Sequence, residues 1–284
     1  MKNGGATAAG DRSRIAFNLD WITRPLFGVV LAAAAIGSTI RGGAWFALFI
    51  VLMVAAASRE YHRMVAKHSY TTAFLVTALT TAATLYAPFF AGDHNLPWAI
   101  LLGGVALNLA LAFVMDERPL WEAGGVLYLC LPAFSATLVR AAPHGIWMIV
   151  GVFIAIWATD TGALVVGNLV GGPKLAPVIS PNKTWAGTLG GVVAAAIVEA
   201  IFMAVVKGDI VLGAFYGAGV AVTAHAGDLF ESWIKRKFQR KDSGRLIPGH
   251  GGVLDRIDST LSATAALFAL VFIFHINPLF GAHP

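Results

Sequence analysis

The chain has 284 residues, of which 57% are hydrophobic and only 12% charged, whereas an average soluble domain carries about 25% charged residues. This composition, with a mean hydropathy of +0.73, excludes an ordinary water-soluble globule and indicates an integral membrane protein. The single cysteine, Cys130, excludes an intrachain disulfide and a cysteine-rich zinc site, while the net charge of +5 suits cytoplasmic loops as well as nucleic acid.

Apolar stretches of near membrane-spanning length recur along the chain. A helix needs about 20 mainly apolar residues to cross the bilayer core, and nine stretches qualify as candidates. The first two are short and flank Gly42 and Gly43, so they form either a tight hairpin or a shallow re-entrant element. The nine predicted spans are Pro25–Ile40, Ala44–Ser58, Tyr70–Ala91, Leu96–Met115, Ala123–Val139, Ile146–Val170, Trp185–Val206, Ile210–Phe230 and Ser259–Ile276.

These spans predict an all-α polytopic membrane protein, with a cytoplasmic segment at residues 1–24 and a single integral membrane domain at residues 25–284. When the N-terminus is placed inside, every basic residue except Arg41, Arg140 and Lys207 falls on the cytoplasmic side. Such an asymmetry fixes orientation during insertion, and nine spans then place the C-terminus outside. A signal peptide is the alternative for the first span, but eight further spans favour a retained one.

Three carboxylates lie inside apolar stretches, where a charged group is costly and faces either a cavity or a partner. Asp160 ends one apolar run and begins a segment of small residues, which favours a functional role. Glu199 has no polar neighbours in sequence, so we interpret it as a buried structural pairing. Asp228 opens the densest polar stretch of the chain, residues 227–258.

If the preceding span continues as a helix into this stretch, polar side chains recur every three or four residues and share one face. These side chains are Asp228, Glu231, Ser232 and Lys235. Two further acids, Asp255 and Asp258, stand three residues apart at the mouth of the last span. Carboxylates at two helix ends suit Mg²⁺, which proteins commonly hold through one or two carboxylates together with substrate phosphates.

The basic residues of the same stretch would neutralise phosphate oxygens. They also satisfy the orientation rule and contact anionic lipid, but neither role explains the Pro-Gly-His-Gly-Gly run at residues 248–252. Its glycines permit a tight turn and let backbone amides approach a ligand.

A second polar loop, residues 171–185, is predicted on the same side of the membrane and is stiffened by three prolines. Its Lys183-Thr184 pair is similar to the end of a Walker A loop, but the required first glycine is missing, so a P-loop is excluded. Hydrogen-bond donors for a phosphate or a base come from Ser180, Asn182, Lys183 and Thr184.

The polar positions of residues 232–258 together resemble the signature of the phosphatidate cytidylyltransferase, or CDP-diacylglycerol synthase, family. They read Ser232-x-Ile234-Lys235-Arg236, Lys241-Asp242-x-Gly244 and Ile247-Pro248-x-His250-Gly251-Gly252-Val253-x-Asp255-Arg256-Ile257-Asp258. The resemblance extends to residues 180–185 and to Asp160, and so covers the C-terminal half of the chain. Ala186 replaces the usual acidic residue and Asn168 the frequent arginine, so neither position is given a role.

The resemblance implies transfer of a cytidylyl group from CTP to phosphatidic acid, which yields CDP-diacylglycerol and pyrophosphate and requires Mg²⁺. We assign Asp228 and Asp255 as metal ligands, Asp258 as a weaker ligand candidate, and Lys235 as a fourth catalytic residue. The expected substrate-binding residues are Asp160, Ser180, Asn182, Lys183, Thr184, Ser232, Arg236, Lys241, His250, Gly251, Gly252 and Arg256. The expected partners are CTP, phosphatidic acid and the lipid bilayer of the cell (inner) membrane, with the active site facing the cytoplasm and no nucleic acid bound.

Two rival functions remain at the level of sequence. A CTP-dependent kinase of a polyprenol or phytol is distantly similar, but the complete signature argues against it. A transporter would also have about nine spans and acids within them, but it would not need a phosphate-binding, glycine-rich loop. Whether the protein is a monomer or a homodimer stays open.

Overall fold

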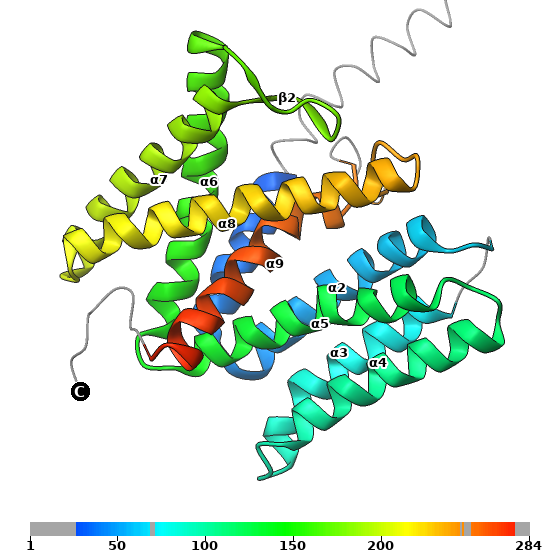
Figure 1. Ribbon diagram of the computed structural model, residues 1–284. Coiled ribbons are helices and arrows are strands. Elements are labelled where there is room, and N and C mark those ends of the chain that lie inside the picture. The colour runs from blue at the N-terminus through cyan, green and yellow to red at the C-terminus, as the bar shows by residue number, and fades with distance from the viewer. Residues whose placement is uncertain (1–26, 69–71, 245, 247–250, 276–284) are drawn as a thin grey trace, which may run out of the picture.

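The computed structural model describes residues 27–68, 72–244, 246 and 251–275. After a helix at Phe27–Arg41, a succession of long helices is interrupted by one small sheet and ends in a π-helical turn (Figure 1). The elements are α2 (Gly43–Val65), α3 (Ala73–Phe90), α4 (Leu96–Val114), α5 (Pro119–Ala141), α6 (Gly145–Val170), β1 (Lys174–Ala176), β2 (Ser180–Thr184), α7 (Trp185–Val206), α8 (Ile210–Lys237), α9 (Leu254–Phe268) and η1 (Ala269–Ile273).

Eight of the described helices are long and apolar enough to cross a membrane, counting α9 and η1 as one helix, Leu254–Ile273. The expected all-α polytopic membrane protein is therefore confirmed. The prediction of nine spans depends on Phe27–Arg41, which is shorter than the other eight. The second predicted span, Ala44–Ser58, ended too early, because α2 continues to Val65. Its added turns contain two buried polar residues, Glu60 and His62, which find partners on other helices.

The helices form two groups that meet on α9. In Figure 1, α6, α7 and α8 lie on one side and the α3–α4 hairpin on the other, while α9 runs through the middle. Buried residues of α9 belong to both main apolar clusters: Leu267 packs with α6 to α8, and Leu261 packs with α2, α3 and α5. Helix α9 is therefore packed against both halves of the chain.

A two-stranded antiparallel sheet replaces the loop predicted over residues 171–185. Lys174 pairs with Thr184 and Ala176 with Ser180, and the tight turn between the strands is closed by a hydrogen bond from the Ile179 amide to the Ala176 carbonyl (3.1 Å). The hairpin leads directly into α7 and reaches over α8, where Arg236 Nε donates to the Ile179 carbonyl at 3.2 Å.

Some buried polar groups within the spans are paired with one another, and Glu199, within the described part of the chain, is not. In the first half, His62 pairs with Glu122 and its Nε2 contacts the Thr77 hydroxyl at 2.8 Å, which ties α2, α3 and α5 together. Glu199 of α7 is also fully buried, but among the described residues neither of its carboxylate oxygens has a hydrogen-bond partner. The expected burial of Glu199 is confirmed, and the expected pairing is wrong.

Candidate active site

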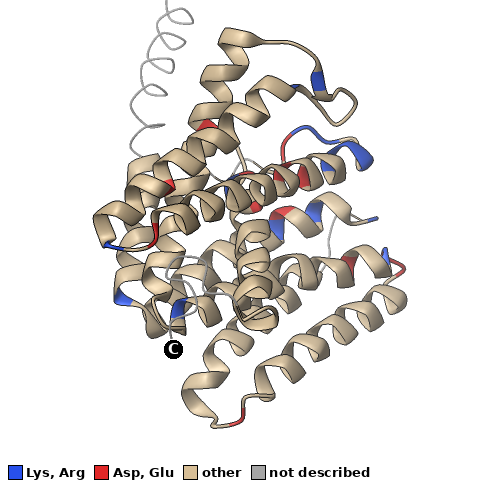
Figure 2. Ribbon diagram, turned by 60° about the vertical axis from the view of Figure 1, so that its left-hand side comes forward, with Lys and Arg blue, Asp and Glu red and all other residues tan. Residues whose placement is uncertain are grey.

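Acidic and basic side chains concentrate where the C-terminal half of α8, the loop after it and the start of α9 meet (Figure 2). The face of α8 predicted from residue spacing is present. Ser232 Oγ lies 3.3 Å from Asp228 Oδ1, and one turn further Lys235 forms an ion pair with Glu231. The helical period therefore places these four side chains as expected.

Lys235 connects this face to α9. Its Nζ lies 2.8 Å from Asp255 Oδ1, and the second oxygen of Asp255 accepts hydrogen bonds from the Gly252 amide at 3.0 Å and the Ser243 amide at 3.3 Å. Gly251, the residue before Gly252, has a φ of 82°, a left-handed conformation that glycine adopts without strain. Both oxygens of Asp255 are thus engaged by groups of the chain itself.

Three carboxylates from the two helices face one another. Asp228, Glu231 and Asp258 each offer an oxygen, and these three oxygens lie within 4.8 Å of one another. Glu231 and Asp258 are buried, with exposed fractions of 0% and 6%, and Glu231 Oε1 has no hydrogen-bond partner in the described part of the chain. Several carboxylate oxygens around one point are the ligands that a hard divalent cation requires, so these residues fit Mg²⁺.

This cluster differs in membership from the predicted pair of metal ligands. Asp228 belongs to it, but Asp255 does not, since its carboxylate lies on Lys235 and the loop amides. Glu231 was not among the predicted site residues, although its position on the same helical face as Asp228 was a signal that could have identified it. The shared ion between Asp228 and Asp255 stays a prediction.

The hairpin contributes a second lysine to the site. Lys183 of β2 places its Nζ 2.5 Å from Asp228 Oδ2, so both polar loops predicted from the sequence come together at Asp228. Neighbouring Thr184 is buried and its hydroxyl accepts a hydrogen bond from the Gly187 amide at 3.1 Å, which caps α7. Ser180 and Asn182 lie on the same strand, and Asn182 is exposed.

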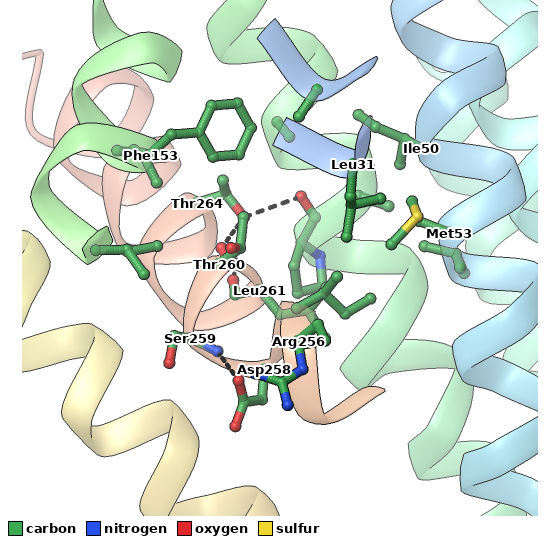
Figure 3. Close-up of a pocket in the computed structure, with 18 of the residues that line it drawn as sticks. Leu31, Ile50, Met53, Phe153, Arg256, Asp258, Ser259, Thr260, Leu261 and Thr264 are labelled. Atoms are coloured by element: carbon green, nitrogen blue, oxygen red, sulfur yellow. Dashed lines mark hydrogen bonds between the residues drawn. The ribbon is translucent and has the colours of Figure 1, made fainter. Parts of the chain in front are cut away.

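A cavity of about 530 Å³ opens beside these groups. Figure 3 shows Asp258 and Arg256 near one end, with Leu31, Ile50, Met53 and Phe153 further along it. Its apolar walls come from Phe27–Arg41, α2, α5, α6 and α9. The polar lining consists chiefly of Asp160, Asp228, Lys235, Asp255, Arg256 and Asp258. The cavity is therefore amphiphilic, with charges at one end and hydrocarbon side chains along the remainder.

The remaining predicted site residues do not contact the three-carboxylate cluster in any interaction described for them. Arg236 is exposed and holds the hairpin through the Ile179 carbonyl, and Lys241 is exposed in the loop after α8. Gly252 is buried beside the Asp255 carboxylate that its amide contacts. His250 lies outside the described residues. A second residue missed from the sequence is Glu60 of α2, whose carboxylate contacts the α8–α9 loop.

Comparison with known proteins places the chain in a family. Residues 22–274 match the model of the cytidylyltransferase family. The phosphatidate cytidylyltransferase of Brucella suis biovar 1 is 36% identical over 260 residues, which cover 89% of this chain and 93% of that protein. The phosphatidate cytidylyltransferase of Haemophilus influenzae is 44% identical over 196 residues, or 62% of this chain and 67% of that protein. The chain therefore belongs to the cytidylyltransferase family.

Proposed function

We propose that this protein is a phosphatidate cytidylyltransferase, which transfers CMP from CTP to phosphatidic acid and releases pyrophosphate. The observation that carries this function is the amphiphilic cavity. A lipid with a phosphate head group needs cations at one end of its site and an apolar channel at the other. Lys235 and Arg256 line the charged end, and side chains such as Leu31, Ile50 and Met53 line the apolar part.

The reaction is a displacement at phosphorus. An oxygen of the phosphatidate phosphate forms a bond to the α-phosphorus of CTP, while the bond to the bridging oxygen of the β-phosphate breaks and pyrophosphate leaves with the electron pair. Because a phosphate monoester is already anionic at neutral pH, the chain does not have to supply a general base. Its main tasks are to orient the two phosphates and to stabilise charge on the leaving pyrophosphate.

Mg²⁺ is the cofactor that these residues suit, and Asp228, Glu231 and Asp258 would hold it, with Asp255 as the further ligand candidate from the sequence. When bound, a divalent cation neutralises charge on phosphate oxygens and orients the nucleotide. Lys183 and Lys235 contact these acids directly, so each lysine can move onto a phosphate oxygen once the acids have a metal to bind.

CTP is proposed to bind between the β1–β2 hairpin and α8, because Lys183 of the hairpin contacts Asp228 of α8 and Arg236 of α8 contacts the Ile179 carbonyl of the hairpin. The head group of phosphatidate would then enter from the cavity, past Asp160 and Arg256. This arrangement brings a water-soluble and a lipid substrate to one point. We place it at the cytoplasmic face of the cell (inner) membrane.

A product assay tests this function against the alternatives. Purified protein in detergent micelles that contain phosphatidic acid is incubated with CTP labelled on the cytosine and with Mg²⁺. We expect the label in the lipid fraction together with stoichiometric pyrophosphate, and loss of both products when EDTA removes the metal.

Each alternative gives a different result in that assay. A CTP-dependent lipid kinase would release labelled CDP and leave no cytidine in the lipid. A transporter would consume no CTP. Either of these results, from protein that elutes as a single folded species, would exclude the proposed function.

A further inference from the structure

Glu60 lies in the last turns of α2, within the half of the chain that carries none of the signature residues. Its side chain nevertheless reaches the start of α9, 194 residues further along. Glu60 Oε2 accepts a hydrogen bond from the Leu254 amide at 2.9 Å and lies 3.4 Å from the Ser243 hydroxyl. With an exposed fraction of 5%, this carboxylate is shielded from water.

The contact with Leu254 supplies what the first turn of α9 lacks. The first N–H groups of a helix have no partner within the helix, and a side chain at the N-cap position usually satisfies one of them. The N-cap of α9 is Val253, which cannot accept a hydrogen bond through its side chain. Glu60 provides the missing acceptor from another helix, and its negative charge is favourable at the positive end of the α9 dipole.

Two glycines of the signature are packed against the same carboxylate. A Cβ atom built on Gly244 would overlap the Glu60 side chain, and one built on Gly252 would overlap Ser243 Oγ and lie 2.6 Å from Glu60 Oε2, closer than real Cβ contacts. The φ of neither residue lies in the left-handed range that requires glycine. Glu60 therefore excludes a side chain at Gly244, and Glu60 together with the Ser243 hydroxyl that it contacts excludes one at Gly252. A residue outside the signature thus explains part of it.

Glu60 and Asp255 fix the loop and the start of α9 together. Asp255 accepts hydrogen bonds from the amides of Ser243 and Gly252, while Glu60 contacts the Ser243 hydroxyl and the Leu254 amide. One turn after Leu254 comes Asp258, a member of the acid cluster. A shift of the first turn of α9 would move Asp255 off Lys235 and Asp258 away from Asp228 and Glu231.

We propose that Glu60 is a positioning residue: it caps α9 from α2 and so sets the distance between the carboxylates of α8 and those of α9. This inference rests on the proposed function for its kinetic consequence, whereas its structural consequence can be measured without any reaction. Loss of an N-cap acceptor weakens the first turn of a helix, and here that turn carries two residues of the site.

The test compares Glu60→Ala, which removes the acceptor, with Glu60→Gln, which keeps the length and one acceptor oxygen. Glu199→Ala is the matched control, because Glu199 is also a buried glutamate of a membrane helix but does not contact the loop. Hydrogen exchange followed by mass spectrometry measures the protection of peptides that cover residues 251–262. Kinetics at varied Mg²⁺ are measured on the same detergent-purified samples.

For Glu60→Ala we expect at least about tenfold faster exchange at the start of α9, with unchanged exchange in α6 and α7. We also expect a fall in kcat of about tenfold and a higher Mg²⁺ concentration for half-maximal activity. Glu60→Gln should restore most of both properties, and Glu199→Ala should leave exchange at the start of α9 as it is in the unmodified protein.

Unchanged exchange at the start of α9 in Glu60→Ala would overturn the proposal, and so would faster exchange spread evenly over all helices. Should Glu60→Ala not yield folded protein, Glu60→Asp gives the same test, since its carboxylate is one methylene shorter and falls short of the Leu254 amide. If the unmodified protein makes no CDP-diacylglycerol, the exchange result still decides whether Glu60 caps α9, so the two failures are distinguishable.

Discussion

Two lysines stand among the four acids of the candidate site and offset half of their formal negative charge. Lys183 contacts Asp228, and Lys235 contacts both Glu231 and Asp255. An isolated charge buried without a partner would be costly, so each lysine stabilises the site before substrate arrives. The same two cations are the nearest positive charges for the phosphates of CTP and phosphatidate.

The acids differ in what they contact, and this difference predicts different effects of mutation. Asp258→Asn removes one charge from the three-carboxylate cluster, so we expect kcat to fall by more than about 100-fold and the Mg²⁺ requirement to rise. Asp255→Asn weakens the orientation of Lys235, so kcat should fall by about 10- to 100-fold, as for groups that orient a metal site, with a nearly normal Mg²⁺ requirement. Initial rates at varied Mg²⁺, on protein with unchanged thermal unfolding, measure both.

A double variant that combines Asp228→Asn with Asp255→Asn gives a second criterion for whether Asp255 is a metal ligand. Two ligands of one ion act as a unit, so their combined loss should hardly exceed either single loss. If Asp255→Asn raises the Mg²⁺ requirement as much as Asp258→Asn and is non-additive with Asp228→Asn, Asp255 is the ligand that the sequence predicted.

At the scale of elements, α7 and α8 begin with comparable caps but in different surroundings. Thr184 accepts from the Gly187 amide at the start of α7, and Asp209 accepts from the Val211 and Leu212 amides at the start of α8. Only Thr184 adjoins Lys183 of the candidate site. Comparing substitutions of Thr184 and Asp209 therefore separates the capping role of Thr184 from its predicted contact with CTP.

Either change to alanine should lower the free energy of unfolding by about 1 kcal/mol, the usual cost of a lost N-cap. If Thr184 also binds CTP, only Thr184→Ala should raise the KM for CTP, while the KM for phosphatidic acid stays the same in both variants. Thermal unfolding and substrate titrations provide the measurements. An unchanged KM for CTP in Thr184→Ala would mean that Thr184 caps α7 and does not bind CTP.

Sequence patterns predicted what depends on local periodicity. Hydropathy identified the long helices, and the spacing of Asp228, Glu231 and Lys235 predicted one polar face, which the ion pair between Glu231 and Lys235 confirms. The hairpin was missed because its strands are only three and five residues long, too short for an alternating pattern. The contact of Glu60 with Leu254 depends on how α2 and α9 pack, which no local pattern encodes.

At the scale of the whole molecule, the cavity exists only because both halves of the chain contribute to its walls. Met53 and Ile50 come from α2, Phe153 comes from α6, and Leu261 comes from α9. If the acyl chains of phosphatidate occupy this space, Met53→Trp should reduce kcat/KM for long-chain phosphatidate by about tenfold or more, because an overfilled apolar site costs about 1–3 kcal/mol.

A short-chain substrate provides the comparison for this variant. Activity with dioctanoyl phosphatidate should fall much less than activity with the dioleoyl form, and the KM for CTP should not change. Equal losses with both lipids would mean that the acyl chains bind elsewhere.

The side of the membrane on which the N-terminus lies depends on one short helix, Phe27–Arg41, whereas the other eight spans can be oriented without it. From α2 to α9 there are eight candidate spans, an even number, so the residues before α2 and the residues after η1 lie on the same side if all eight cross. The basic residues Arg41, Arg140 and Lys207 lie at the opposite ends of their helices from the candidate site, which favours placing the site inside and the C-terminus outside.

The N-terminus lies inside only if Phe27–Arg41 also crosses the membrane, although the described part of this helix spans only about 22 Å against about 30 Å of hydrocarbon. We expect that it does cross, because Lys2, Arg12, Arg14 and Arg24 then remain on the cytoplasmic side.

Alkaline phosphatase, which is active only outside, should be active when fused after Pro284 and inactive when fused after Asp116 of the α4–α5 loop. The thiol introduced by Ala8→Cys should resist a membrane-impermeant reagent in intact cells and react after permeabilisation. Reaction in intact cells would show that Phe27–Arg41 is re-entrant, and an inactive fusion after Pro284 would show that the orientation inferred from the basic residues is wrong.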